Sequence, residues 1–158
     1  MKYLLFLLVV LAGKTALACN VTISSPSSSI CFGDSVTLTA AGSGNATFVW
    51  MPGNVTGNSI TVSPATTTTY TVTSTDTSGC VSTNTKTITV NLLPAVSVTA
   101  TLDTICVGIS TTLTATGANS YMWMPGNIAA QSITVSPMNT STYTVIGTAS
   151  GTGCTKTV

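Results

Sequence analysis

The stretch Trp50-Met51-Pro52-Gly53-Asn54, "WMPGN", occurs a second time without change as Trp123–Asn127. Five further motifs surround it in the same order both times: Ile-Cys-x-Gly, Leu-Thr-Ala, Ser-Ile-Thr-Val-Ser-Pro, Thr-Tyr-Thr-Val and Gly-Cys. The two copies follow each other at a period of about 74 residues. A repeat of this kind predicts two copies of one structural unit.

Within each copy, apolar residues stand two apart, as Phe48 and Trp50 do. Residues two apart lie on one face of a β-strand, and the abundant Thr and Val favour strands over helices. Gly, Asn and Pro mark turns between these short segments. We therefore expect an all-β protein with two tandem immunoglobulin-like β-sandwich domains. The core aromatic residues that this pattern predicts are Trp50, Tyr70, Trp123 and Tyr143.

The first 18 residues predict a secretory signal peptide, because a Lys2 start, a short apolar run and small residues at Ala16 and Ala18 follow one another. The apolar run is far shorter than the roughly 20 residues of a membrane-spanning helix, so no transmembrane helix is expected. We assign 1–18 to the signal peptide, 19–93 to the first domain and 94–158 to the second. The short apolar linker predicts domains that stand end to end with a limited hinge.

Charge is nearly absent beyond the signal peptide. The charged residues there are Lys86, Lys156, Asp34, Asp76 and Asp103, and the sequence contains no His, Arg or Glu. Nucleic-acid binding needs clustered cations, so that class of partner is excluded. The sequence offers no general base, no metal-binding cluster and no phosphate-binding loop, so we expect neither an enzyme nor a cofactor.

Four cysteines bracket the two copies. Cys31 and Cys80 lie 49 residues apart, and Cys106 and Cys154 lie 48 apart. In an exported protein, this matched spacing predicts one disulfide within each domain, Cys31 to Cys80 and Cys106 to Cys154.

Cys19 is left over and directly follows Ala16-Leu17-Ala18. A lipidated cysteine of a bacterial lipoprotein would stand at this place, although Ala16 occupies the position that is usually Leu. Lipidation of Cys19 and an ordinary signal-peptidase cut nearby both remain open.

The motifs from Ile-Cys-x-Gly to Gly-Cys resemble the Ig-like/PKD-like repeats of Bacteroidetes secreted and cell-surface proteins, over nearly all of the chain beyond the signal peptide. The resemblance implies extracellular tandem β-sandwiches that serve as spacers or adhesive stalks, without catalytic residues. Family members commonly have a small polar residue where Met51 and Met124 stand.

The second copy ends four residues after Cys154, whereas the first continues for a full strand after Cys80. The last strand of the second domain is therefore expected to be mostly missing, which exposes an unpaired edge. We expect a fragment of a longer gene product. The alternative is a chain whose second domain is completed by a strand from a neighbouring subunit.

Two further features are open to a functional interpretation. Met51 and Met124 alternate out of phase with the core pattern, so an open face there would favour self-association. Ser35 and Thr104 lie in Asp-Ser-Val and Asp-Thr-Ile, which resemble a short O-glycosylation signal of this bacterial group.

Together these features predict a non-catalytic structural or adhesive repeat segment of a secreted or surface-attached bacterial protein, acting as a spacer or cell-surface interaction module. Its partners would be other cell-surface proteins or glycans. The alternatives are a glycan-binding accessory module, in which the tryptophans stack on sugars, and a strand-exchanging fibre subunit.

Overall fold

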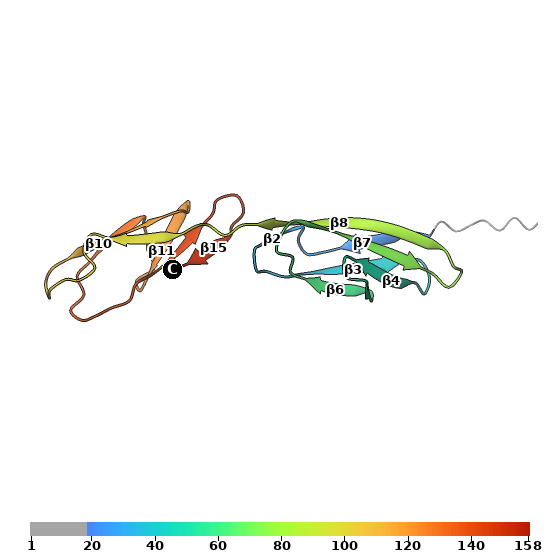
Figure 1. Ribbon diagram of the computed structural model, residues 1–158, viewed down its shortest axis with the longest axis horizontal. Coiled ribbons are helices and arrows are strands. Elements are labelled where there is room, and N and C mark those ends of the chain that lie inside the picture. Colours follow the sequence, from blue (N-terminus) through green and yellow to red (C-terminus); the bar gives the residue numbers. More distant parts are fainter. Residues whose placement is uncertain (1–18) are drawn as a thin grey trace, which may run out of the picture.

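The computed structural model describes residues 19–158, and the regular structure in that range is β-strand throughout (Figure 1). The predicted signal peptide lies outside the described residues. Within residues 19–158, no helix of a length and apolarity sufficient to cross a membrane occurs.

The strands divide into two successive groups. In the first group they are β1 (Val21–Ser24), β2 (Ser29–Cys31), β3 (Val36–Gly42), β4 (Thr47–Met51), β5 (Val55–Thr56), β6 (Ser59–Val62), β7 (Thr68–Thr75) and β8 (Val81–Asn91). In the second group they are β9 (Ser97–Ala100), β10 (Thr111–Thr116), β11 (Ser120–Met124), β12 (Ile128–Ala129), β13 (Ser132–Val135), β14 (Thr144–Thr148) and β15 (Thr155–Thr157).

The first domain is a sandwich of a three-stranded sheet, β1-β3-β6, and a five-stranded sheet, β2-β8-β7-β4-β5. Neighbouring strands are antiparallel except for β2 and β8, which pair in parallel. The order β8-β7-β4 in one sheet, facing β1-β3-β6 in the other, is the immunoglobulin arrangement of G-F-C against A-B-E. The predicted class, an all-β protein of tandem β-sandwiches, is confirmed.

The second domain repeats this plan with two differences. Its sheets are β13-β10-β9 and β12-β11-β14-β15. The segment that corresponds to β2 forms no strand, and β15 has 3 residues where β8 has 11. The last strand of the second sandwich, β15, is thus short. Within residues 19–158, no segment corresponds to the second half of β8.

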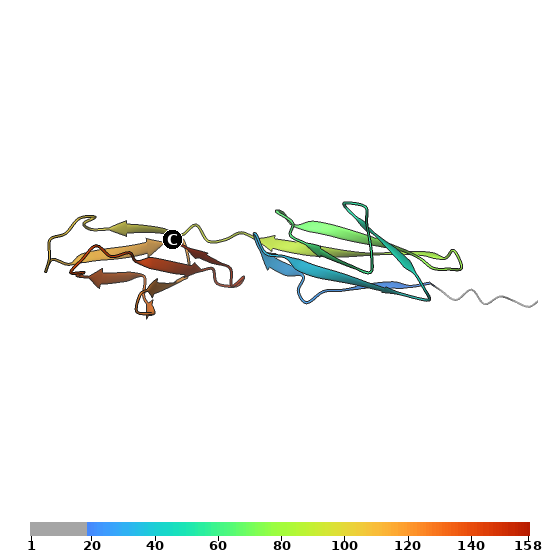
Figure 2. The ribbon, with the colours of Figure 1, turned by 90° about the horizontal axis from the view of Figure 1, so that it is seen from below.

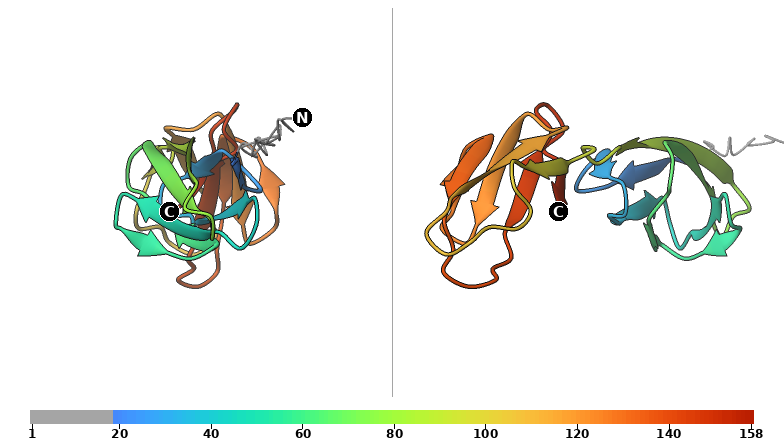
Figure 3. Two further views of the ribbon diagram at one scale, coloured as in Figure 1. Left: turned by 90° about the vertical axis from the view of Figure 1, so that its right-hand side faces the viewer. Right: turned by 60° about the vertical axis from the view of Figure 1, so that its left-hand side comes forward.

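The two domains follow one another along the long axis of the molecule (Figures 1 and 2). A single extended stretch between β8, which ends at Asn91, and β9, which begins at Ser97, connects them (Figure 3). Each domain has its own hydrophobic core, and the two cores share no residue.

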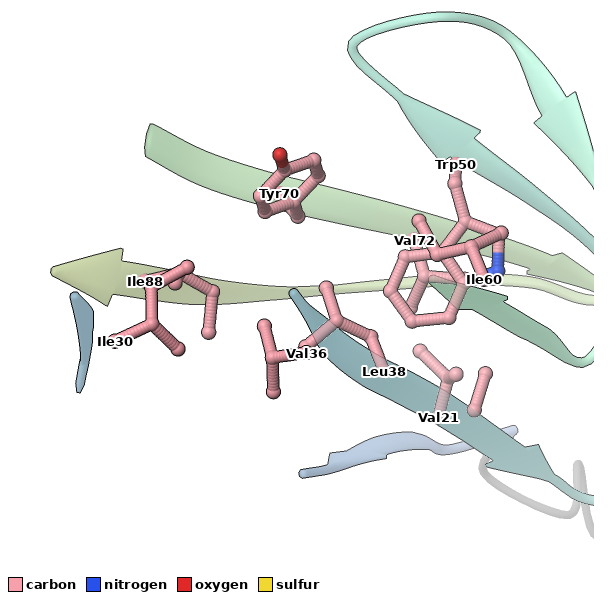
Figure 4. Packing of buried hydrophobic residues seen from close by; sticks show 10 residues of the cluster. Val21, Ile30, Val36, Leu38, Trp50, Ile60, Tyr70, Val72 and Ile88 are labelled. Carbon is pink, nitrogen blue, oxygen red and sulfur yellow. The ribbon is translucent and has the colours of Figure 1, made fainter. Parts of the chain in front are cut away.

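Each core is built around its tryptophan. The exposed fraction of Trp50 and of Trp123 is 0%. Trp50 lies beside Val72 of the same sheet, and Ile60 and Leu38 belong to the sheet that faces it (Figure 4). The indole Nε1 of Trp50 donates a hydrogen bond of 2.9 Å to the carbonyl oxygen of Gly57. Trp123 makes the matching bond, also 2.9 Å, to the carbonyl oxygen of Ala130.

The corner tyrosines differ between the two domains. Tyr70 is buried, whereas Tyr143 is only half-buried. Burial raises the pKa of the Tyr70 hydroxyl above its ordinary value. The difference arises because Ile88 and Ile30 close the core next to Tyr70, whereas the second domain has no counterpart of Ile88 within residues 19–158.

The repeated "WMPGN" stretch turns the chain after the core strand. In both copies the Met-Pro peptide is cis and the asparagine adopts a positive φ, 52° at Asn54 and 51° at Asn127. A positive φ is uncommon outside glycine, and asparagine is one of the residues that tolerate it best. The motif therefore repeats because each copy builds the same turn from β4 into β5 and from β11 into β12.

We expect Trp50→Phe to lower the free energy of unfolding of the first domain by about 2–3 kcal/mol. The change leaves the Gly57 carbonyl without its donor and opens a space in the core. Urea denaturation followed by circular dichroism measures the effect. Met51→Ala is the matched control, because Met51 is exposed, and its effect should stay within about 0.5 kcal/mol. Equal effects of the two substitutions would contradict this account of the core.

Candidate functional site: the cysteine turns and an open cleft

Each domain carries two different cysteine turns, and each turn has nearly the same geometry in both domains. The first kind, here called the Cys-x-Gly turn, spans 31–34 and 106–109. Its cysteine carbonyl accepts a 3.0 Å bond from the amide of Asp34 in one domain and of Ile109 in the other. The glycine takes a positive φ, 94° at Gly33 and 85° at Gly108.

The second kind, the Gly-Cys turn, precedes the last strand of each domain and spans 76–80 and 149–154. The amide of Asp76 donates to the carbonyl of Cys80 at 3.0 Å, and the amide of Ala149 donates to the carbonyl of Cys154 at 2.9 Å. Thus corresponding cysteines have matching backbone hydrogen bonds, although Cys31 also ends strand β2 and the second Gly-Cys turn is one residue longer than the first.

The two kinds of turn lie at opposite ends of the domain. Cys80 directly precedes β8, and Cys31 is paired with Asn91 at the last residue of the same strand. The 11 residues of β8 extend over about 35 Å at roughly 3.3 Å per residue. A disulfide requires Cα atoms within about 7 Å. The predicted Cys31–Cys80 disulfide is therefore wrong.

The structure instead joins the two domains through Cys31 and Cys154, whose Cα atoms are 5.6 Å apart. The Cys-x-Gly turn of the first domain meets the Gly-Cys turn of the second, since the domains stand end to end. The predicted Cys106–Cys154 disulfide is wrong for the same reason as the first, because the second domain also places its two turns at opposite ends.

Cys19 takes the partner that the sequence assigned to Cys31. It is bonded to Cys80, with Cα atoms 6.1 Å apart, at the end of the first domain that faces away from the second. A lipid thioether would use the same Sγ atom, so lipidation and this disulfide exclude each other. The feature of the sequence that could have predicted this bond is the position of Cys19, two residues before β1. The start of β1 lies near the turn between β7 and β8, which holds Cys80.

Cys106 remains a free, exposed thiol, the only one among the described residues. It lies at the end of the second domain that faces away from the first. Its neighbours Val107 and Ile109 are exposed apolar residues, with exposed fractions of 76% and 50%.

Asp76 organises the Gly-Cys turn of the first domain. Its Oδ1 accepts bonds from the Ser78 hydroxyl at 2.6 Å, the Ser78 amide at 2.8 Å and the Cys80 amide at 2.9 Å. The Ser78 hydroxyl, followed by the Cys80 amide, holds the pKa of Asp76 below its ordinary value. Ala149 stands at the corresponding place in the second domain, so only the turn that holds Cys80 has this carboxylate.

An open cleft of about 610 Å³ lies in the second domain. Leu113, Trp123, Val135 and Tyr143 line its floor, and Leu102 and Met138 stand at its rim. In the first domain, the corresponding space is closed by the second half of β8, where Ile88 has an exposed fraction of 0%. Within residues 19–158, no segment of the second domain corresponds to that half of β8, and the cleft lies at this place.

The backbone beside the cleft is also open. In the first domain, Thr68 to Thr71 pair with Ile88 to Thr85. In the second, the ladder between β14 and β15 ends where Val145 and Val158 exchange two hydrogen bonds. Residues 141–144 therefore have no strand on this side within the part of the chain that the structure describes.

The remaining predicted site residues lie apart from one another. Met51 and Met124 are exposed, at 51% and 38%, on the outer face of β4 and β11. Ser35 and Thr104 are exposed beside the two Cys-x-Gly turns. Within residues 19–158, no group of three His, Cys, Asp or Glu side chains could hold a metal ion.

No protein-family model matches the chain, and no curated protein matches it by sequence. Among solved structures, it is similar to three N-terminal domains of the highly immunogenic outer capsid protein of bacteriophage RB49, with 23% identity and a TM-score of 0.45. That match covers 89% of this chain and 58% of the phage chain.

Two further structures are similar at lower identity. For murine CEACAM1b the identity is 16% and the TM-score 0.43, with 87% of this chain and 96% of that chain covered. For the fibronectin(III)-like modules of Clostridium thermocellum CbhA the identity is 12% and the TM-score 0.42, with 88% of this chain and 92% of that chain covered. Function therefore has to be argued from the residues of this chain.

We expect Asp76→Ala to lower the thermal midpoint of the first domain near neutral pH, and the deficit to vanish in acid. Because the folded pKa lies below the unfolded value of about 3.9, the stabilisation is complete above that value and is lost as the pH falls through the folded pKa. Thermal unfolding of both proteins from pH 7 to pH 2 measures the difference. Ser78→Ala should show a smaller deficit, since the backbone donors remain. A deficit that persists unchanged at pH 2 would contradict the role of the carboxylate.

Proposed function

We propose that this chain is a non-catalytic spacer segment of a secreted or surface-attached bacterial protein, which holds its two β-sandwiches end to end at a fixed distance. The observation that supports the proposal most is the Cys31–Cys154 disulfide, because it fastens one domain to the next instead of stabilising a single core. Disulfides persist in oxidising, extracellular surroundings, which suits an exported protein. The nearly uncharged surface gives the segment little electrostatic attraction for other molecules.

The disulfide also changes how the segment would bear a mechanical load. A force applied between the residue before Cys19 and Val158 passes from Cys31 directly to Cys154 through the covalent bond. The residues between these cysteines, a sequence separation of 123, are removed from the path of the force. A spacer that is pulled at its ends could therefore keep its length even if a core were to unfold.

The glycan-binding alternative has less support from the aromatic residues. Both tryptophans are buried, and each indole N–H is bonded to a backbone carbonyl within its own domain. Neither ring presents a face on which a sugar could stack. Phe32, in the Cys-x-Gly turn of the first domain, is exposed, but Val107 takes its place in the second.

We expect the oxidised chain, stretched between its ends in a single-molecule force measurement, to lengthen by about 430 Å less than the reduced chain. This value is the 123-residue separation at roughly 3.5 Å per residue. Adding a reductant during the measurement should release that length.

Two double variants serve as controls under oxidising conditions. Cys19→Ser with Cys80→Ser should not lengthen the chain, since the Cys31–Cys154 bond is intact. Cys31→Ser with Cys154→Ser should release only about half of the length, because Cys19–Cys80 still encloses a separation of 61 residues. Full extension of the oxidised wild-type chain would refute the spacer proposal.

The cleft of the second domain favours a second candidate function, that of a strand acceptor in a strand-exchanging fibre. An extended segment with the pattern of Thr85–Asn91 would pair with residues 141–144 and place two apolar side chains over Leu113 and Tyr143. In the first domain, Ile88 and Val90 occupy this place and pack on the core. Addition of a strand to an open sheet edge supplies main-chain hydrogen bonds and side-chain pockets together.

We expect a synthetic peptide with the sequence of Thr85–Asn91 to bind the second domain and to raise its thermal midpoint. A ligand that binds only the folded state raises the free energy of unfolding, and the increase grows with the logarithm of the ratio of ligand concentration to Kd. A peptide with Ile88→Asn and Val90→Asn is the matched control, since it keeps the backbone and loses the apolar side chains. The native peptide should shift the NMR signals of Ile105 and Tyr143, and equal shifts with both peptides would contradict the proposal.

A further inference from the structure

We infer that Cys106 is a covalent linkage site for a second copy of this chain, and that its partner there is Cys80. The two copies would join head to tail, the second domain of one copy against the first domain of the next. The inference extends the proposed spacer from one chain to several chains, and it can fail while the bond within one chain holds.

The first support is the bond that the structure already contains. Cys31 and Cys106 occupy the same position in the same turn, with matching hydrogen bonds and matching glycine φ angles. Cys80 and Cys154 correspond in the same way. The Cys31–Cys154 disulfide thus shows a Cys-x-Gly turn joined to a Gly-Cys turn of the next domain. Cys106 is the Cys-x-Gly cysteine that lacks such a partner among the described residues.

The second support is the apolar surface around Cys106, which is independent of the thiol. Leu102 and Ile109 are exposed there, and the corresponding residues of the first domain are Ser27 and Asp34. Met138 is 80% exposed at the same end, where the first domain has Ala65. An exposed apolar patch of this kind is typical of a surface that contacts another protein.

The opposite end of the molecule offers a matching surface. Val81, the residue after Cys80, is 59% exposed, and Val107, the residue after Cys106, is 76% exposed. If the copies dock as the two domains of one chain do, these two valines flank the new bond. At the junction within the chain, Phe32 and Thr155 take the places of Val107 and Val81.

The linkage needs no oxidant, because Cys80 is already part of a disulfide. The Cys106 thiolate of one copy attacks Sγ of Cys80 in the next copy, and the Cys19–Cys80 bond breaks as the Cys106–Cys80 bond forms. Cys19 leaves as a thiolate and takes up the proton that Cys106 lost. One disulfide replaces another, and the number of free thiols per chain stays at one.

The test uses residues 19–158 with both disulfides formed, kept concentrated without an added oxidant and then quenched with an alkylating reagent. We expect a ladder of trimers and larger species in non-reducing electrophoresis. Peptide mapping should find Cys106 linked to Cys80, and the alkyl label should move from Cys106 to Cys19. Cys106→Ser should abolish the ladder.

A relocated thiol is the matched control. Cys106→Ser combined with Gln131→Cys keeps one exposed thiol on the second domain, away from the Cys-x-Gly turn. We expect at least tenfold less material above the dimer from this variant than from the wild-type chain. Three results would overturn the inference: a ladder of equal strength in the control, species that stop at a dimer linked through two Cys106 residues, or no linked species from the wild-type chain.

Discussion

The length of the last strand is the constraint on which the rest of the molecule depends. β8 pairs with β7 from Thr75 opposite Val81 to Thr68 opposite Ile88, and then continues beside β2 as far as Asn91. A strand of this length keeps the turn before it and the turn beside its last residue at opposite ends of the domain. Cysteines in these two turns cannot meet within one domain, so they bond to whatever stands at each end. The fold of a single repeat thereby prevents a disulfide between its own two cysteine turns, and in this chain Cys31 of the first domain bonds to Cys154 of the second.

The features that the sequence predicted well are those with a short-range cause. Alternation of apolar residues at a period of two produces strands, and the repeated turn residues separate them, so the two sandwiches followed from local patterns. The same alternation placed Trp50 and Trp123 on the inward face, and the structure buries both. Even the short last strand of the second domain could be read from the residues after Cys154, where β15 has only 3 residues.

The cysteine pairing could not be obtained in this way, because spacing along the chain says nothing of which end of a strand a residue occupies. Cys31 and Cys80 bracket one repeat in sequence, yet β8 separates them by its full length. The missing information was the parallel pairing of β2 with β8, a contact between residues about 60 apart. Once that pairing is known, the two disulfides can be understood. Cys19 lies at the end of the first domain that holds Cys80, and Cys154 lies at the end of the second domain that meets Cys31.

In the second domain, the segment before the Cys106 turn is held without the strand pairing that holds the corresponding segment of the first domain. In the first domain, Ser29–Cys31 is held by pairing with β8. In the second, Thr111 replaces the core residue Val36, and its Oγ1 accepts from the amide of Leu102 at 3.0 Å and donates to the Leu102 carbonyl at 2.9 Å. These bonds fix the chain just before the Cys106 turn to β10. A buried hydroxyl that is fully bonded stabilises the backbone that it holds. The turn that presents Cys106 is therefore positioned from within its own domain, while the nearby sheet edge and the thiol have no partner among residues 19–158.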